Sequence, residues 1–199
     1  MAPIKVFVDA DCLHKLYLRK LLFTLDTQGI IELLWTNQVF DEALSSLISR
    51  FPQKADSLGS MFAGYREHFS GTEVTGYQHL LGTLNCSDPD DEQVLAGALT
   101  GKADFLLTYN LKDFPSESNR LGKPIIVHPD LFLFELLSEE GRSTALFVDW
   151  LCLFNNPVGH AIGGAEALER TGCLLTASLL RETRLEIDSQ LLSRGRDAQ

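Results

Sequence analysis

Residues 4–13 have the sequence IKVFVDADCL, in which a largely apolar run is followed at once by Asp9 and Asp11. A short apolar run of this kind is typical of a buried strand in a parallel sheet. Similar runs recur at residues 30–35 (IIELLW), 104–108 (DFLLT) and 124–127 (PIIV), separated by segments with helical periodicity. This alternation predicts βαβ units and therefore an α/β fold, with a central parallel sheet flanked by helices.

The helices between these strands are marked by caps and breakers. Asp88 is expected to cap a helix that starts at Pro89, because Asp is a favoured N-cap and Pro fits the first helical position. Thr36 or Asn37 is expected to cap the helix that Pro52 stops. The predicted helices span about 13–26, 37–51, 54–69, 89–100 and 130–137, and the stretch 73–86 is ambiguous, with a short strand near 73–75 as one alternative.

Beyond residue 137 the pattern is helical, at about 144–154, 163–171 and 174–193, without a strand signal. The polar segment 138–143, SEEGRS, is a candidate boundary, so two domains are predicted: residues 1–137 and a helical C-terminal extension, 138–199. The stretch TALFVDWLCLF is apolar on nearly every side of a helix, and such a helix must be covered all round. Either Trp150 and Phe154 pack within their own chain, or the surplus apolar surface contacts another molecule.

Composition narrows the class of protein. The chain of 199 residues has a formal net charge of -10, which argues against binding nucleic acid through a broad basic surface. Its apolar runs are shorter than the ~20 residues of a membrane span, and its start leads directly into a strand, so we expect a cytoplasmic protein with no membrane partner. The four cysteines are far apart in the sequence, which favours reduced thiols.

Acidic residues recur where elements begin or end. Asp9 follows the first strand, Glu42 lies in the first turns of a helix, and Asp113 follows the strand at 104–108. Asp91 shares the core-facing stripe of its helix with Val94, since successive residues turn by ~100°. If the four converge, their mutual repulsion calls for a divalent cation between the oxygens, and that chemistry suggests phosphodiester hydrolysis.

Each of these residues also has an ordinary structural explanation. Asp9 could be a turn residue or a cap, although Asp11 could serve as that cap instead. Glu42 could be a solvated residue of the helix, with Asp41 as its rival for a functional role. Asp91 could be a capping-box partner of Asp88, and Asp113 could be a simple turn residue.

The blocks FVDADCL, DPDDEQVLAGAL and ADFLLTYNLKDF, with a helical Glu between the first two, together resemble the PIN-domain nucleases, particularly the VapC-type toxins of toxin–antitoxin systems. The resemblance covers residues 4 to about 137 and implies a PIN-like three-layer fold. It places the family's catalytic, metal-binding quartet on Asp9, Glu42, Asp91 and Asp113. The accessory positions are Asp11, Asp88, Thr108 and Asn110. Asp11 departs from the family's usual Asn, Ser or Thr.

The resemblance implies a ribonuclease that depends on Mg2+ or Mn2+ and acts as the toxin of a toxin–antitoxin pair. Its expected partners are an RNA substrate, a cognate antitoxin and a second copy in a homodimer. Two alternatives stay open: a non-catalytic PIN-like module that binds RNA or protein, and a haloacid-dehalogenase-like phosphatase using Asp9, Asp11 and Thr108. The phosphatase is disfavoured because its second acidic pair should follow Thr108, whereas DPDD precedes it.

Overall fold

The computed structural model describes residues 2–84, 86, 88–115, 124–138, 142–154 and 157–197. The chain forms two compact units: Met1–His14 with Gly29–His128, and Lys15–Gln28 with Pro129–Gln199. We call them the sheet unit and the helical unit. Of the segment expected to divide the chain, residues 139–141 lie outside the described residues, and the division between 137 and 138 stays a prediction.

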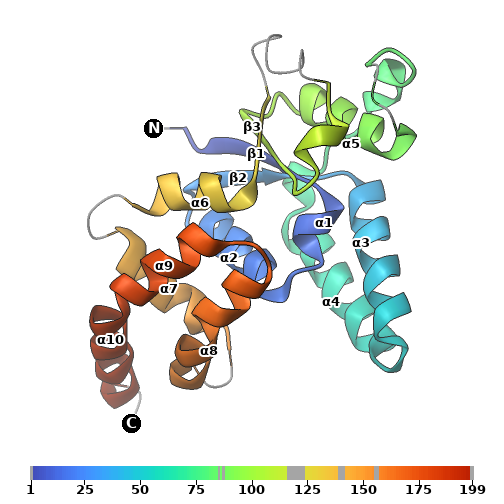
Figure 1. Ribbon diagram of the computed structural model, residues 1–199. Helices are drawn as coiled ribbons and strands as arrows, with labels where there is room; N and C mark the ends of the chain where they lie inside the picture. Colours follow the sequence, from blue (N-terminus) through green and yellow to red (C-terminus); the bar gives the residue numbers. More distant parts are fainter. Residues whose placement is uncertain are drawn as a thin grey trace. The chain divides into compact units, whose positions relative to one another are not determined.

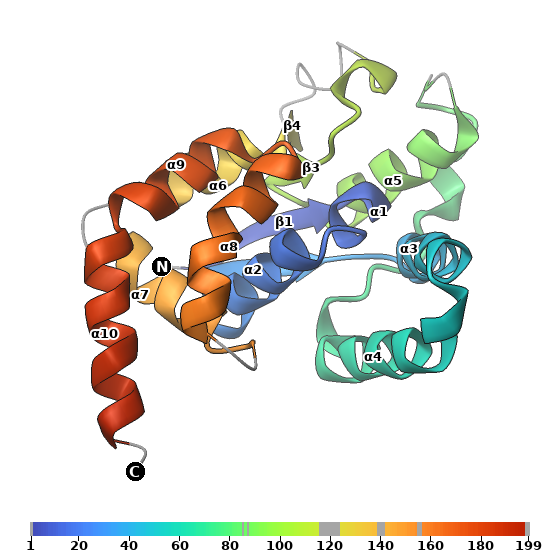
Figure 2. The same cartoon turned by 60° about the horizontal axis from the view of Figure 1, so that its bottom comes forward.

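The sheet unit contains four parallel strands in the order β2-β1-β3-β4, of which β1, β3 and β4 are labelled in Figure 2. They are β1 (Ile4–Val8), β2 (Ile31–Leu34), β3 (Phe105–Leu107) and β4 (Ile125–Val127). Val8 pairs with Leu107, and Leu107 pairs with Val127, so β1, β3 and β4 end side by side. All four predicted strands are confirmed, and with them the α/β class and the parallel sheet.

Helices of the sheet unit confirm the predictions at 37–51, 54–69 and 89–100, and a short helix at residues 10–13 was not predicted (Figure 1). They are α1 (Ala10–Leu13), α3 (Asn37–Arg50), α4 (Ala55–His68) and α5 (Pro89–Thr100), with 3-10 turns η1 (Pro52–Lys54), η2 (Ser70–Thr72), η3 (Tyr77–Leu80) and η4 (Leu111–Asp113). In the ambiguous stretch, Glu73 forms only an isolated parallel bridge to Trp35, after which the chain turns into η3.

Close packing of α5 on the sheet depends on two glycines. A Cβ atom at Gly97 would lie 2.7 Å from the ring of Phe7, and one at Gly101 would lie 2.8 Å from the side chain of Val74. Phe7 is completely buried, so its ring has little room to yield. These glycines let the helix that carries Asp91 approach β1 closely.

The helical unit consists of α2 (Leu16–Thr27), α6 (Pro129–Leu137), α7 (Arg142–Leu151), α8 (Pro157–Arg170), α9 (Leu174–Glu182) and α10 (Arg184–Asp197). Two predicted helices differ. The helix expected from residue 13 starts at Leu16, because Lys15 is extended and separates it from α1. The helix expected over 174–193 is divided at Thr183, whose N–H donates to the Leu179 carbonyl at the end of α9 and whose backbone angles (φ -86°, ψ 2°) are not helical.

Most apolar side chains of the segment TALFVDWLCLF are covered by its own chain, although Leu153 is exposed. Trp150 is fully buried, and its indole N–H donates to the Tyr17 carbonyl oxygen at 3.1 Å. The Phe154 ring stacks on the Tyr17 ring with centroids 5.0 Å apart. Packing within the chain is therefore confirmed for Trp150 and Phe154. The large apolar side chains left exposed in this unit are instead leucines, including Leu153, Leu174, Leu175, Leu185 and Leu192.

A buried carboxylate joins two helices of the same unit. Asp130 in α6 accepts hydrogen bonds from the backbone N–H groups of Leu175 and Thr176, at 2.9 and 2.8 Å, at the start of α9. The Thr176 hydroxyl donates to it as well.

Among the described helices, none has the length and apolar character needed to cross a membrane. The cysteine thiols are reduced, with Cys12 and Cys173 buried.

Candidate active site

Asp9 lies at the carboxyl end of β1 and is held on three sides. Its Oδ1 accepts from the Ala10 N–H at 2.6 Å, which makes Asp9 the N-cap of α1. Its Oδ2 accepts from the Thr108 hydroxyl at 2.8 Å, and its own N–H donates to the Leu107 carbonyl. Asp9 is only 7% exposed. Of the two acids that could cap this helix, Asp9 is therefore the one that does so.

Asp11 connects α1 to the turn after β3. Its Oδ2 accepts from the Tyr109 N–H at 2.9 Å and lies 3.5 Å from the Thr108 hydroxyl. Thr108 is completely buried and also accepts from the Asn110 N–H at 3.0 Å. Thr108 therefore contacts both carboxylates while it fixes the turn that leads toward Asp113.

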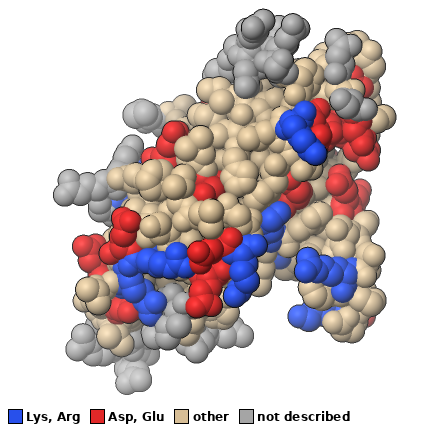
Figure 3. Space-filling view, viewed as in Figure 1, with Lys and Arg blue, Asp and Glu red and all other residues tan. Residues whose placement is uncertain are grey.

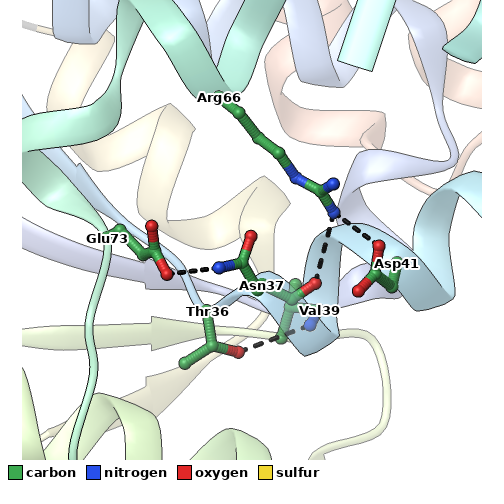
Figure 4. Close-up of polar contacts among 6 residues, drawn as sticks. All are labelled: Thr36, Asn37, Val39, Asp41, Arg66 and Glu73. Carbon is green, nitrogen blue, oxygen red and sulfur yellow. Dashed lines mark hydrogen bonds and ion pairs between the residues drawn. The ribbon is translucent and has the colours of Figure 1, made fainter. Parts of the chain in front are cut away.

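Glu42 lies in the second turn of α3, and Figure 4 shows the contacts at the start of that helix. The Thr36 hydroxyl accepts from the Val39 N–H at 3.3 Å and caps the helix, as predicted for one of two candidates. The Asn37 side-chain amide donates to the Glu73 carboxylate, joining the first helical residue to the chain beside β2. These contacts fix the turn of helix that presents Glu42.

Arg66 pairs with Asp41, the residue before Glu42 in α3 (Figure 4). Its guanidinium donates to Asp41 Oδ1 at 2.6 Å and to the Asn37 carbonyl oxygen at 3.4 Å. Asp41 is therefore engaged in an ion pair between α3 and α4, whereas Glu42 is affected by the charges of Asp90 and Asp11. This observation favours Glu42 over its rival Asp41.

The start of α5 presents the next group of acids. Asp88 caps the helix by accepting from the Asp90 N–H at 2.9 Å, and Pro89 is its first residue, as predicted. Asp91 and Glu92 are both half-buried and Asp90 is exposed, so the inward orientation expected for Asp91 stays a prediction. Glu92 accepts from the backbone N–H groups of Gly82 and Leu84, which lowers the pKa of its carboxyl.

Asp113 completes the set at the end of η4. It is half-buried, and its N–H donates to the Asn110 carbonyl at 3.0 Å. Asn110 itself is exposed. The Asp113 charge raises the pKa of Asp91, so the two carboxylates lie within electrostatic range although they are separated in sequence.

The carboxylates near this edge of the sheet raise one another's pKa. Burial, followed by the charge of Asp11, raises the pKa of Asp9 to about 7, and Glu42 adds to this shift. Glu42 as a whole is exposed, but partial desolvation of its carboxylate raises its pKa, and Asp90, Asp11 and Asp91 raise it further. The pKa of Asp91 is raised by burial and then by Asp113. The seven carboxylates of this acidic cluster are Asp9, Asp11, Glu42, Asp88, Asp90, Asp91 and Asp113.

A thiol beside the cluster feels the same field. Burial raises the pKa of the Cys86 thiol to about 11, and Glu92 and Asp91 contribute to the shift. Only the thiolate is an effective nucleophile, so Cys86 stays protonated near neutral pH. Cys86 is therefore not a candidate nucleophile, and the candidate functional groups of the site are its carboxylates.

The donor set fits a hard divalent cation, because Mg2+ and Mn2+ prefer carboxylate oxygens and would relieve the repulsion that raises these pKa values. The positions are less compact than a finished metal cage. Among the residues that the structure describes, no three Asp, Glu, His or Cys side chains are grouped closely enough to hold one metal ion. Side chains would have to move, or waters would have to bridge, for a cation to be bound.

Sequence reasoning had singled out the carboxylates but not the residues that support them. Arg66 carried no signal, because its partner Asp41 is 25 residues away in the chain. Tyr109 was passed over within FLLTYNLKDF, although its backbone binds Asp11.

Comparison of the chain with family models, curated proteins and solved structures finds no match.

Proposed function

We propose that this protein is a metal-dependent ribonuclease with a PIN-like fold, hydrolysing RNA phosphodiester bonds at the acidic cluster. The observation that carries the proposal is the concentration of mutually repelling carboxylates at the carboxyl ends of β1 and β3, with the pKa of Asp9 raised to about 7. In open parallel sheets this edge is where ligands bind. Keeping so many like charges together is unfavourable without a cationic ligand.

Within this proposal Asp9, Asp91 and Asp113 are the residues that would hold Mg2+ or Mn2+. The bound cation would lower the pKa of a water molecule and offset charge on the phosphate oxygens. Thr108 and the Ala10 N–H fix both oxygens of Asp9, so that this carboxylate keeps one orientation. Glu42, more exposed than Asp9, would orient the attacking water or hold a second ion.

The wider biological role rests on the resemblance described above. A VapC-type toxin would have RNA as its substrate, a cognate antitoxin as its inhibitor and a second copy as its partner in a homodimer. The charge distribution is compatible with a substrate held mainly at the site: on the face drawn in Figure 3, Lys and Arg occur in small groups among Asp and Glu. Such a surface offers limited non-specific affinity for phosphate.

The test is cleavage of total RNA and of short RNA oligonucleotides by the full-length protein, with Mg2+, with Mn2+ and with a chelator. We expect cleavage with either ion and none with the chelator, and mapping of product ends would identify the bond cut. Activity that persists unchanged in the chelator would contradict the proposal. Release of phosphate from a small phosphomonoester, without RNA cleavage, would favour the phosphatase alternative.

A non-catalytic module that binds RNA is the second candidate. It is favoured by the spacing of the described carboxylates, among which no three are close enough to share a metal ion. The two candidates differ in a direct measurement, titration with Mn2+ followed by calorimetry. A nuclease should bind Mn2+ in a manner that the Asp9→Asn and Asp91→Asn substitutions weaken, whereas a module that only binds RNA should not.

A further inference from the structure

An aromatic pair stands at the same sheet edge as the acidic cluster. Tyr109 follows β3 by two residues, and His128 follows β4 directly. The two strands end in register, because Leu107 of β3 pairs with Val127 of β4. The Tyr109 and His128 rings meet edge to face, with centroids 4.6 Å apart and an interplanar angle of 82°. Both residues are half-buried, so each is in part accessible to solvent.

Hydrogen bonds connect the chain at Tyr109 to the carboxylates. The Tyr109 backbone N–H donates to Asp11 Oδ2 at 2.9 Å, and the side-chain hydroxyl of its neighbour Thr108 donates to Asp9 Oδ2 at 2.8 Å. The Thr108 N–H also donates to the Val127 carbonyl, next to His128. Asp9, Thr108, Tyr109 and His128 therefore form a row across the ends of β1, β3 and β4.

We propose that the Tyr109–His128 pair is a stacking platform for one unpaired base of an RNA strand, next to the phosphate at the acidic cluster. This inference rests on the proposed ribonuclease function and names the form of its substrate. Tyr and His are side chains on which unpaired RNA bases stack, and the edge-to-face contact from His128 keeps the Tyr109 ring in one orientation.

Charge makes such a platform useful here. A chain with a formal net charge of -10 gains little affinity from general phosphate contacts, so an uncharged contact must supply binding energy and register. Stacking does so without regard to base identity, because every base has a π-face. A paired base is held in its helix and is not available to stack. The site therefore selects single-stranded or looped RNA over duplex RNA.

The test measures the binding of a fluorescently labelled, unstructured RNA oligonucleotide to the full-length protein by fluorescence anisotropy. The buffer contains Ca2+ in place of Mg2+ or Mn2+. Tyr109→Ala should weaken binding about tenfold, in line with the loss of one base stack. Tyr109→Phe should bind like the wild type, because the ring remains. Tyr65→Ala is the matched control: Tyr65 is another half-buried tyrosine in an edge-to-face pair, with Phe62, on α4.

Oligonucleotides with one abasic position complete the test. At one position the abasic change should cost wild-type protein as much as Tyr109→Ala does, and the two losses should not add, as for groups that contact each other. Equal binding by wild type and Tyr109→Ala overturns the platform, even if RNA is cleaved. RNA binding that depends on Tyr109 without any cleavage supports the platform and overturns the hydrolytic function. Tighter binding of duplex RNA also overturns the platform.

Discussion

Asp9 illustrates how one side chain at the sheet edge combines structural and chemical roles. It caps α1 and accepts from Thr108, yet burial and the Asp11 charge raise its pKa to about 7 from an ordinary value of 3.8. The hydrogen bonds alone would favour the ionised form, so desolvation and repulsion outweigh them. A carboxylate in this state releases its proton readily when a cation arrives.

This shift predicts how stability depends on pH without divalent ions. Because the folded pKa of Asp9 lies above its unfolded value, the folded protein binds more protons between pH 4 and pH 7, and stability falls as pH rises through that range. The raised pKa values of Glu42 and Asp91 act in the same direction. Melting temperatures measured in a chelator should therefore be higher at mildly acidic pH than at pH 8.

Two controls sharpen this prediction. Asp9→Asn should flatten the pH profile and raise the melting temperature at pH 8, since it removes a charge from the cluster. Mn2+ should raise the melting temperature more at pH 8 than at acidic pH, because binding requires deprotonated ligands. A profile that rises from pH 5 to pH 8 in the chelator would argue against the assigned environment of Asp9.

Asp91→Asn tests the catalytic role directly. The substitution keeps the side-chain shape but removes a charge that Asp113, Asp88 and Asp90 oppose. We expect RNA cleavage to be lost while the melting temperature in a chelator stays equal or rises. Asp56→Asn is the matched control, because Asp56 is an exposed acid in the first turn of α4, lies outside the acidic cluster and should retain cleavage. Equal losses in both variants would mean that net charge, and not the position of Asp91, matters.

At the scale of elements, the contact of α5 with β1 sets the position of Asp91. Gly97→Ala should destabilise the protein by about 1–3 kcal/mol, the usual cost of overpacking, because the new methyl group would meet the buried Phe7 ring and the Thr36 side chain. Gly64→Ala is the control: a Cβ there meets nothing within 4 Å, and the exchange should stabilise α4 by roughly 0.5–1 kcal/mol.

Urea denaturation of both variants would measure these effects. The two substitutions make the same chemical change in the middle of a helix, so a difference in sign isolates the tertiary contact. A stabilised Gly97→Ala variant would mean that Phe7 and α5 separate more easily than the packing indicates. It would also weaken the argument that this contact holds Asp91 in place.

At the scale of the whole molecule, the helical unit combines an early helix with the C-terminal ones. The apolar side chains of α2, including Leu18, Leu21 and Leu22, are completely buried, and Trp150 and Phe154 contact its first turn. A chain ending at Leu137 would lack α7 to α10 and would expose this apolar surface. We expect such a protein to aggregate, and light scattering or gel filtration would show it.

Substitution of exposed leucines separates this effect from association between copies. Leu185→Ser and Leu192→Ser lie on exposed positions of α10 and should leave the melting temperature unchanged. If a homodimer forms through this helix, they should lower its apparent mass in light scattering. A truncated chain that remains monomeric, with the melting temperature of the intact protein, would contradict the role assigned to the C-terminal helices.

Local sequence signals were sufficient to predict the strands, most helices and the candidate carboxylates. Buried strands of a parallel sheet are nearly continuous apolar runs, and Asp88-Pro89 carries its capping chemistry within two residues, so these features are local. The inward orientation predicted for Asp91 also rests on helical periodicity alone. The break at Thr183 was missed because helical periodicity continues across it, while the backbone contact that ends α9 depends on local geometry.

Contacts between residues distant in the sequence became known only from the folded structure. It made Asp9 the cap of α1, paired Asp41 with Arg66, and placed Thr108 against two carboxylates nearly a hundred residues earlier. It also grouped α2 with the C-terminal helices, since burial of an apolar face depends on partners distant in the chain. Such contacts carry no local signal, because parallel strands join segments whose separation in sequence is set by the intervening helices.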